Sequence, residues 1–354
     1  MTFNSFGKIF SFTSFGESHG KAIGVVVDGV PAGFSLNEND IQKELDRRKP
    51  GQSKVTSERK EEDKVDIISG IFEGKTTGMP IAMLIHNKDV KSADYSKIKD
   101  VFRPGHADYT YETKFGIRDY RGGGRSSARE TAMRVAVGAI AKKYLKEKGI
   151  SIYGFTREVA GIRAEKTNLN VIEKNSVRAP DLNAAKAMEE IILAAKHHGD
   201  SVGGIVEIIA KGVPPGLGEP VYYKLDSKLA EALMSINAVK GVEIGSGFAS
   251  TIMRGSHHND KITKVKGKVK FETNNAGGIT GGISNGDDIV ARIAVKPASS
   301  IAIEQNTINK KGKNAKISVK GRHDPCLCPR AVPVAEAMVA IVLMDLYLIA
   351  KTRK

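Results

Sequence analysis

Two stretches of the chain, residues 16–33 and residues 199–216, repeat each other. Seven residues of the first have an identical counterpart at a constant offset in the second: Gly16, Ser18, Gly20, Gly29, Val30, Pro31 and Gly33 correspond to Gly199, Ser201, Gly203, Gly212, Val213, Pro214 and Gly216. Further along the chain, residues 74–78 (GKTTG) precede an apolar run and resemble residues 282–286 (GISNG), which precede another apolar run. A gapless match of this kind indicates an internal duplication. We therefore expect two pseudo-equivalent halves, about 1–180 and 181–354, with strand-rich segments flanking helices.

The chain of 354 residues is longer than most single domains, yet no low-complexity linker separates its halves. We therefore expect one domain over residues 1–354 in which the halves are intertwined. Helices are predicted where Asn37 caps a segment that runs to about Arg48, over residues 181–198, and over residues 333–350. The last segment is apolar round most of its surface, which predicts a core or interface helix.

The composition limits the class of protein. A formal charge of +15, from 55 Lys+Arg against 40 Asp+Glu, indicates an anionic partner such as nucleic acid, a membrane surface or a phosphorylated metabolite. The two cysteines, Cys326 and Cys328, are too close for ordinary disulfide geometry and lack further ligands at metal-site spacing. With no signal-peptide pattern and no apolar stretch of membrane-spanning length, we expect a reduced, cytoplasmic protein without a metal or a membrane.

Three consecutive glycines at residues 122–124 lie in the segment RDYRGGGRSSARET. Four arginines flank them, namely Arg118, Arg121, Arg125 and Arg129. Ser127 and Glu130 have the spacing of a capping box, which predicts a helix over residues 128–145 closed by Gly149. Backbone N–H groups at a helix start and bidentate arginines both bind anions, so the segment predicts an anion site. A flexible loop ahead of a capped helix is the alternative interpretation.

Histidines and one aspartate supply the remaining chemistry. His19 lies among small residues, which leaves room for a ligand, and His106, His323 and Asp324 lie in other Gly- or Pro-containing loops. Imidazole titrates near neutral pH, so such histidines suit general acid catalysis. These residues predict an enzyme that acts on a phosphorylated or carboxylated small molecule. A basic nucleic-acid-binding protein is the competing class, although the chain has no Trp and its arginines are not interleaved with aromatic residues.

Five longer stretches resemble one known family. They read FGESHGKAIGVVVDGVPAG, RPGHAD, RDYRGGGRSSARETAMR, SINAVKGVEIGSGF and GRHDPC, and the resemblance runs from residue 6 to about residue 345. On these residues the chain resembles the chorismate synthase family. The resemblance implies an α+β fold in which a helical core is sandwiched between two antiparallel β-sheets, assembled as a homotetramer.

The same resemblance implies a lyase of the shikimate pathway of aromatic amino acid biosynthesis. The implied reaction converts 5-enolpyruvylshikimate 3-phosphate to chorismate and phosphate by anti-1,4-elimination, and it requires reduced FMN without net redox change. His19 resembles the acid for the departing phosphate, and His106 the group that protonates the reduced flavin. Asp324 resembles the carboxylate that helps the flavin N5 accept the substrate proton.

The resemblance also implies two sets of binding residues. The implied substrate-binding residues are Ser18, Arg48, Arg103, Arg129 and Arg322. The implied flavin-binding residues are Arg125, Ser126, Ser127, Asn237, Ala238, Gly281, Lys296, Pro297, Ala298, Ser299, Ser300 and Arg322.

Lys54 stands where many members of the family have arginine, so Arg48 and Lys54 are only candidate positions for an NADP contact. The chain leaves little room for a reductase domain. We therefore expect NADPH at most as an indirect reductant, with an external flavin reductase as a partner. Another flavin-dependent phosphate lyase and the nucleic-acid-binding protein stay open as alternatives.

Overall fold

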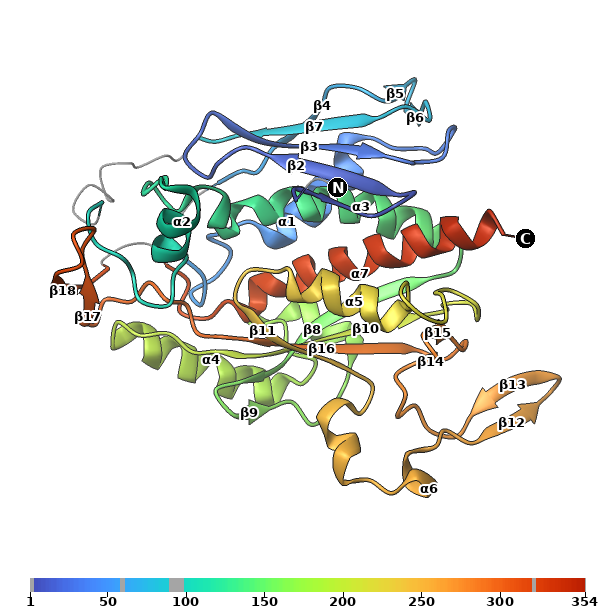
Figure 1. Ribbon diagram of the computed structural model, residues 1–354. Coiled ribbons are helices and arrows are strands. Elements are labelled where there is room, and N and C mark those ends of the chain that lie inside the picture. Colours follow the sequence, from blue (N-terminus) through green and yellow to red (C-terminus); the bar gives the residue numbers. More distant parts are fainter. Residues whose placement is uncertain (1–2, 58–60, 89–98, 320–322, 354) are drawn as a thin grey trace.

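The computed structural model describes residues 3–57, 61–88, 99–319 and 323–353 (Figure 1). Two five-stranded antiparallel sheets enclose a layer of helices, which confirms the predicted α+β architecture. The first sheet has the order β1 (Ser5–Phe6), β2 (Ser11–Phe15), β3 (Ala22–Asp28), β7 (Ile81–His86) and β4 (Val65–Ile67). The second has the order β11 (Val239–Ile244), β16 (Ile289–Val295), β10 (Gly204–Lys211), β8 (Ser151–Val159) and β9 (Ile162–Arg163).

The helical layer consists of α1 (Glu38–Arg48), α3 (Thr131–Glu147), α5 (Leu225–Met234) and α7 (Cys328–Lys351). Outside this layer lie α2 (Asp108–Phe115), α4 (Leu182–His197) and the short α6 (Gly255–His258) (Figure 1). The described residues also form four small hairpins: β5–β6 (Ile71–Phe72 and Lys75–Thr76), β12–β13 (Ile262–Val265 and Lys268–Phe271), β14–β15 (Ile279–Thr280 and Ile283–Ser284) and β17–β18 (Gln305–Ile308 and Asn314–Ile317).

The core lies where α3 and α7 pack against each other between the sheets. A Cβ atom added at Gly138 of α3 would lie 2.3 Å from the Ala337 Cβ of α7, so the helices approach as closely as they do because Gly138 has no side chain. By length and composition α7 is the one helix among the described residues that could cross a membrane. Its apolar side chains are nevertheless buried inside the protein, as expected for a core helix.

The central strand pairs of the two sheets have matching registers. Val25 of β3 pairs with Met83 of β7, and Ile208 of β10 pairs with Ala291 of β16. The offset between the two glycine-rich repeats relates Val25 to Ile208, and the offset between GKTTG and GISNG relates Met83 to Ala291. The duplication itself stays a prediction, and this shared register supports it.

Equivalent side-chain hydrogen bonds strengthen the same prediction. The Thr76 hydroxyl donates to the Pro31 carbonyl at 2.6 Å, and the Ser284 hydroxyl donates to the Pro214 carbonyl at 2.6 Å. Each hydroxyl also accepts a backbone N–H from the opposite turn, at 3.0 Å and 2.9 Å respectively. Thus each half attaches a small hairpin to its Val-Pro turn in the same way.

Two predicted helices were confirmed closely and two began at other residues. Asn37 caps α1 and Asp181 caps α4, as predicted. The predicted capping box at Ser127 was wrong, because the Ser127 side chain accepts from the Arg129 N–H in a 3-10 turn and Glu130 instead pairs with Arg134. The helix α3 therefore begins at Thr131.

The last helix begins five residues before the predicted start, at Cys328. Pro333 lies inside α7, where it has no N–H to donate to the carbonyl of Pro329 one turn earlier. The Arg178 guanidinium donates to that carbonyl instead, at 2.6 Å. This contact from a distant segment lets the helix continue through a residue that normally ends one.

Candidate active site

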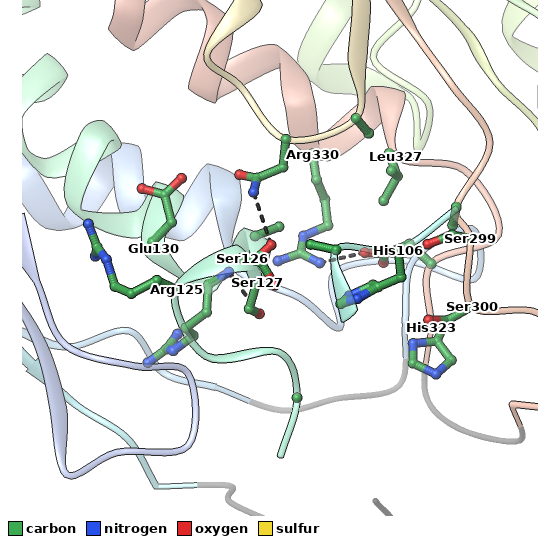
Figure 2. Close-up of a pocket in the computed structure, with 18 of the residues that line it drawn as sticks. His106, Arg125, Ser126, Ser127, Glu130, Ser299, Ser300, His323, Leu327 and Arg330 are labelled. Carbon is green, nitrogen blue, oxygen red and sulfur yellow. Dashed lines mark hydrogen bonds and ion pairs between the residues drawn. The ribbon is translucent and has the colours of Figure 1, made fainter. Parts of the chain in front are cut away.

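A cavity of about 1070 Å³ lies near the N-terminal end of α7. Its walls come from segments far apart in the sequence: the glycine run, the RPGHAD loop before α2, the Asn237 and Lys296 segments, and the loop that contains Asp324. Figure 2 shows Arg125, Ser126 and Ser127 to one side of His106, with Ser299, Ser300 and His323 to its other side. The fold therefore brings most of the predicted site residues to one place.

The glycine run lies against two predicted catalytic histidines, through Gly122 and Gly123. All three glycines have positive φ angles, +69° at Gly122, +91° at Gly123 and +54° at Gly124, a backbone conformation that favours glycine. A Cβ atom at Gly122 would lie 2.2 Å from the Cε1 of His19, and one at Gly123 would lie 3.0 Å from the Cε1 of His106. The run was expected to present N–H groups to an anion. In the structure it is also the surface on which both imidazole rings lie.

His19 lies on the cavity wall and is 8% exposed. The Ser18 hydroxyl lies 3.1 Å from His19 Nδ1. Ser18 itself is buried and does not line the cavity. Its position suits a residue that orients His19 from behind better than one that touches a ligand.

His106 is linked to a buried ion pair. Its Nδ1 lies 3.1 Å from Asp108 Oδ1, and Asp108 accepts from the Nε of Arg103 at 2.8 Å and from an Nη atom of Arg103 at 2.9 Å. Burial lowers the pKa of His106, and the positive charge of Arg103 lowers it further against the opposing effect of Asp108. The neutral imidazole is therefore the favoured form at neutral pH.

Arg48 and Arg129 share one carboxylate. Asp63 is fully buried; it pairs with Arg48 at 2.9 Å and with Arg129 at a shorter distance, while Glu61 lies 3.7 Å from Arg129. Burial alone would raise the pKa of the Asp63 carboxyl, and the two guanidinium groups lower it overall. Burial also lowers the pKa of Arg48 to about 10. Both predicted substrate clamps are therefore neutralised within the protein.

Two cations on the cavity wall differ from these arginines. Arg125 donates to neutral oxygens of Ser14 and Gly16, and Lys296 donates to the Gly105 carbonyl at 2.9 Å. Among the lining residues that the structure describes, these are the Arg and Lys side chains with no carboxylate partner. Burial, followed by the charge of Lys240, lowers the pKa of Lys296. We call Arg125 and Lys296 the unpaired cations.

Asp324 and His323 form another part of the cavity wall. Asp324 accepts from the Ser57 N–H at 2.7 Å and from Arg330 at 2.5 Å. Burial, with the nearby charge of Arg103, lowers the pKa of His323 to about 4, so its ring is neutral at pH 7. The loop thus presents a carboxylate held in place by two donors beside an uncharged imidazole.

The structure leaves some predicted residues outside the cavity. Gly281 lies in the turn of the β14–β15 hairpin, and Lys54 offers its carbonyl to Lys196; neither lines the cavity. Arg322 lies outside the described residues. The remaining predicted residues other than Ser18 line it: His19, Arg48, Arg103, His106, Arg125, Ser126, Ser127, Arg129, Asn237, Ala238, Lys296, Pro297, Ala298, Ser299, Ser300 and Asp324.

The four arginines that flank the glycine run do not form one anion site. Arg118 is buried beside Asp108 and donates to the carbonyls of Lys99 and Val101, while Arg121 pairs with Asp119 at the surface. Neither lines the cavity. The two structural arginines precede the glycine run, whereas Arg125 and Arg129, which line the cavity, follow it.

Sequence reasoning missed the acidic partners of the arginines. Asp108 stands two residues after His106 in RPGHAD, so its spacing was a readable signal. Asp63 carried no such signal, since it meets Arg48 and Arg129 only in the folded chain. Arg330, which pairs with Asp324, was also missed.

A cavity lined by three imidazoles, the Asp324 carboxylate and the two unpaired cations defines an enzyme site that binds an anionic small molecule and moves protons. Comparison with known proteins specifies the class further. The family model described as chorismate synthase matches residues 10–348. The chorismate synthase of Pelagibacter ubique (strain HTCC1062) is 57% identical, over 100% of this chain and 99% of that protein.

A solved structure agrees with both matches. A crystal structure of chorismate synthase superposes with a TM-score of 0.79 and 34% identity, covering 97% of this chain and 92% of that one. The chain belongs to the chorismate synthase family, and it is an enzyme of that family.

Proposed function

We propose that this enzyme converts 5-enolpyruvylshikimate 3-phosphate to chorismate and phosphate with the help of reduced FMN. The observation that carries the proposal is the convergence of His19, His106 and Asp324 on one cavity that also exposes the unpaired cations. The substrate carries a phosphate and two carboxylates, and such groups bind guanidinium and ammonium groups strongly. Family membership supplies the identity of the reaction.

The cavity fits a flavin. Asn237 donates to the Ser126 carbonyl at 3.1 Å, whereas its Oδ1 is buried with no hydrogen-bond partner among the described residues. Such an orphaned acceptor suits a ring N–H of a ligand. Ala238, at φ +69°, accepts from the Lys296 N–H at 2.9 Å and so joins two of the predicted flavin-binding segments.

The remaining wall supports the same fit. Pro297 and Ala298 offer small apolar surfaces, and Ser299 and Ser300 offer hydroxyl groups. Arg125 would hold the anionic end of the cofactor. When bound, reduced FMN supplies a reversible store of electron density and protons that side chains lack.

The elimination breaks the C–O bond to phosphate and one C–H bond while a new double bond forms. His19 supplies a proton or a hydrogen bond to the departing phosphate, which makes the phosphate a weaker base and a better leaving group. His106 would exchange a proton with a flavin held in the cavity. Asp324 would help the proton of the broken C–H bond to leave toward that flavin. Ser18 keeps His19 oriented through the contact at 3.1 Å.

The partners follow from the same family membership. We expect a cytoplasmic homotetramer that receives reduced FMN from an external flavin reductase, with NADPH acting only through that reductase. Exposed apolar side chains such as Phe248 and Ile252, at 76% and 89% exposure, suit burial between subunits. Sedimentation velocity at two protein concentrations would test the tetramer, and a monomer at both would refute it.

An anaerobic assay tests the function. Purified enzyme, reduced FMN and 5-enolpyruvylshikimate 3-phosphate should give chorismate absorbance and free phosphate in equal amounts. No chorismate under these conditions would refute the proposal. Phosphate release without chorismate would instead identify another flavin-dependent phosphate lyase, and a salt-dependent RNA gel shift would favour the nucleic-acid-binding alternative.

A further inference from the structure

His106 and Asp108 form a histidine–carboxylate pair at the start of α2. His106 is partly open to the cavity, with 17% of its side chain exposed, whereas the Asp108 side chain is only 3% exposed. The ring Nδ1 faces Asp108 Oδ1 at 3.1 Å. The other ring nitrogen, Nε2, faces Gly123, where a Cβ atom would lie 3.4 Å away.

Asp108 is surrounded by donors. Its oxygens accept from the backbone N–H of Arg103 at 3.1 Å and twice from its guanidinium, and the guanidinium of Arg118 lies 3.4 Å away. Burial favours the protonated acid, but the hydrogen bonds from Arg103 and His106 outweigh it and keep the pKa of Asp108 well below its ordinary value. Asp108 is therefore a carboxylate, which can only accept hydrogen bonds.

We propose that Asp108 is a positioning residue that fixes His106 in the Nδ1–H tautomer, so that Nε2 is the nitrogen that exchanges a proton inside the cavity. The carboxylate forces the hydrogen onto Nδ1, because two acceptors cannot face each other at this distance. The absence of a side chain at Gly123 keeps the Nε2 edge open. The catalytic consequence rests on the proposed function, whereas the tautomer itself does not.

The charges around His106 favour the neutral ring. Arg103 and Lys296 both oppose its protonation, and His323 is a neutral neighbour at pH 7. Among the described residues, Asp108 favours the cation. A free imidazole prefers the Nε2–H tautomer. Fixing the opposite tautomer in a neutral ring is therefore a property that this environment imposes.

Nitrogen-15 NMR of the enzyme with labelled histidine tests the tautomer without any turnover. Loss of one signal set in His106→Gln assigns the ring. At pH 7.5 we expect a protonated Nδ1 and an unprotonated Nε2 in the unmodified enzyme, and movement toward the opposite tautomer in Asp108→Asn. A protonated Nε2 in the unmodified enzyme would overturn the proposal, whatever the reaction catalysed.

A double-mutant cycle tests the catalytic consequence. Asp108→Asn should lower kcat by roughly a hundredfold or more, since tautomer loss in another histidine–carboxylate enzyme costs about 10⁴-fold. In the His106→Gln background the same change should cost less than about threefold, because its effect acts through that ring. An equal loss of kcat in both backgrounds would overturn the positioning role. It would mean that Asp108 acts only by pairing with Arg103.

Asp119→Asn is the matched control. Asp119 also holds an arginine, Arg121, through two side-chain hydrogen bonds beside the glycine run. Among the described residues, no hydrogen bond or ion pair joins Asp119 to His19 or His106. The control should leave both kcat and the His106 signals unchanged. If all variants and the unmodified enzyme lack turnover, the proposed function fails, and the NMR result still decides the tautomer.

Discussion

Gly122→Ala tests how the glycine run positions His19. The new Cβ would lie 2.2 Å from His19 Cε1 and 2.4 Å from its Nδ1, where ordinary contacts begin at 3.4 Å. The Gly122 backbone is held in a run of three residues with positive φ, so the His19 ring is the part that moves. To reach an ordinary contact of 3.4 Å, the ring must shift by about 1.2 Å. A misplacement of about 1 Å in a catalytic group can cost about a hundredfold in rate. We expect kcat to fall by about that factor.

The change also strains the backbone. An alanine at φ +69° costs about 1–2 kcal/mol relative to glycine. The unfolding entropy of about 2.1 cal/mol/K per residue over 354 residues is about 0.74 kcal/mol/K, so Tm should fall by only about 1–3 °C. Most of the variant therefore stays folded at 25 °C, and lost activity reflects the site.

Gly116→Ala separates strain from displacement. Gly116 has a similar φ of +71°, but no other atom of the described residues lies within 4 Å of an added Cβ. It should share the loss of Tm and keep kcat within about twofold. Anaerobic steady-state kinetics and thermal melting of both variants give the comparison. Equal kcat values in the two variants would refute the role of Gly122 in placing His19.

Three further predictions concern the site and the core. His106→Ala should lower kcat by about a hundredfold or more in the anaerobic assay, and near-normal turnover would remove His106 from the mechanism. Arg125→Ala should weaken FMN binding by about 1.5–3 kcal/mol, measured by fluorescence titration, and oxidised FMN should bind the unmodified enzyme more tightly when substrate is present. An unchanged affinity in either comparison would contradict the proposed flavin-binding site. Burial raises the pKa of Glu336, but Lys142 and Arg47 lower it overall from 4.5 to about 2. Its contribution to folding is therefore complete above pH 4.5 and is lost as the pH falls toward 2. Urea unfolding should show Glu336→Gln to be less stable by about 3–5 kcal/mol at pH 7, with a smaller difference at pH 3; an equal difference at both pH values would refute the assignment.

Much of the fold could be predicted from local patterns. Asn37 and Asp181 cap the starts of their helices through hydrogen bonds to nearby residues, so their sequence neighbourhood was sufficient. The start of α7 could not be predicted in this way. The helix continues through Pro333 because Arg178 donates to the Pro329 carbonyl. Arg178 lies 151 residues before Pro329, so only the fold reveals that contact.

The candidate site divides along the same line. His19, His106 and Asp324 could be predicted as site residues because each lies in a short motif rich in Gly or Pro. The state of the arginines depended on partners at long range, since Asp63 is 15 residues from Arg48 and 66 from Arg129. A count of arginines therefore overestimated the positive charge that the cavity offers to a ligand.

Those carboxylates also bear on the nucleic-acid alternative. Arg48, Arg103 and Arg129 are at most 5% exposed and each pairs with an aspartate, so none can neutralise a phosphate on an extended backbone lying over the surface. A small anionic substrate that enters the cavity can reach their edges. Replacing each by lysine should lower kcat/KM, because lysine loses the planar fork that Asp63, Asp108 and the substrate each match. Salt dependence of RNA binding should stay unchanged in the same three variants. Unmodified kinetics in all three, with a reduced salt dependence, would instead place these arginines in a nucleic-acid interface.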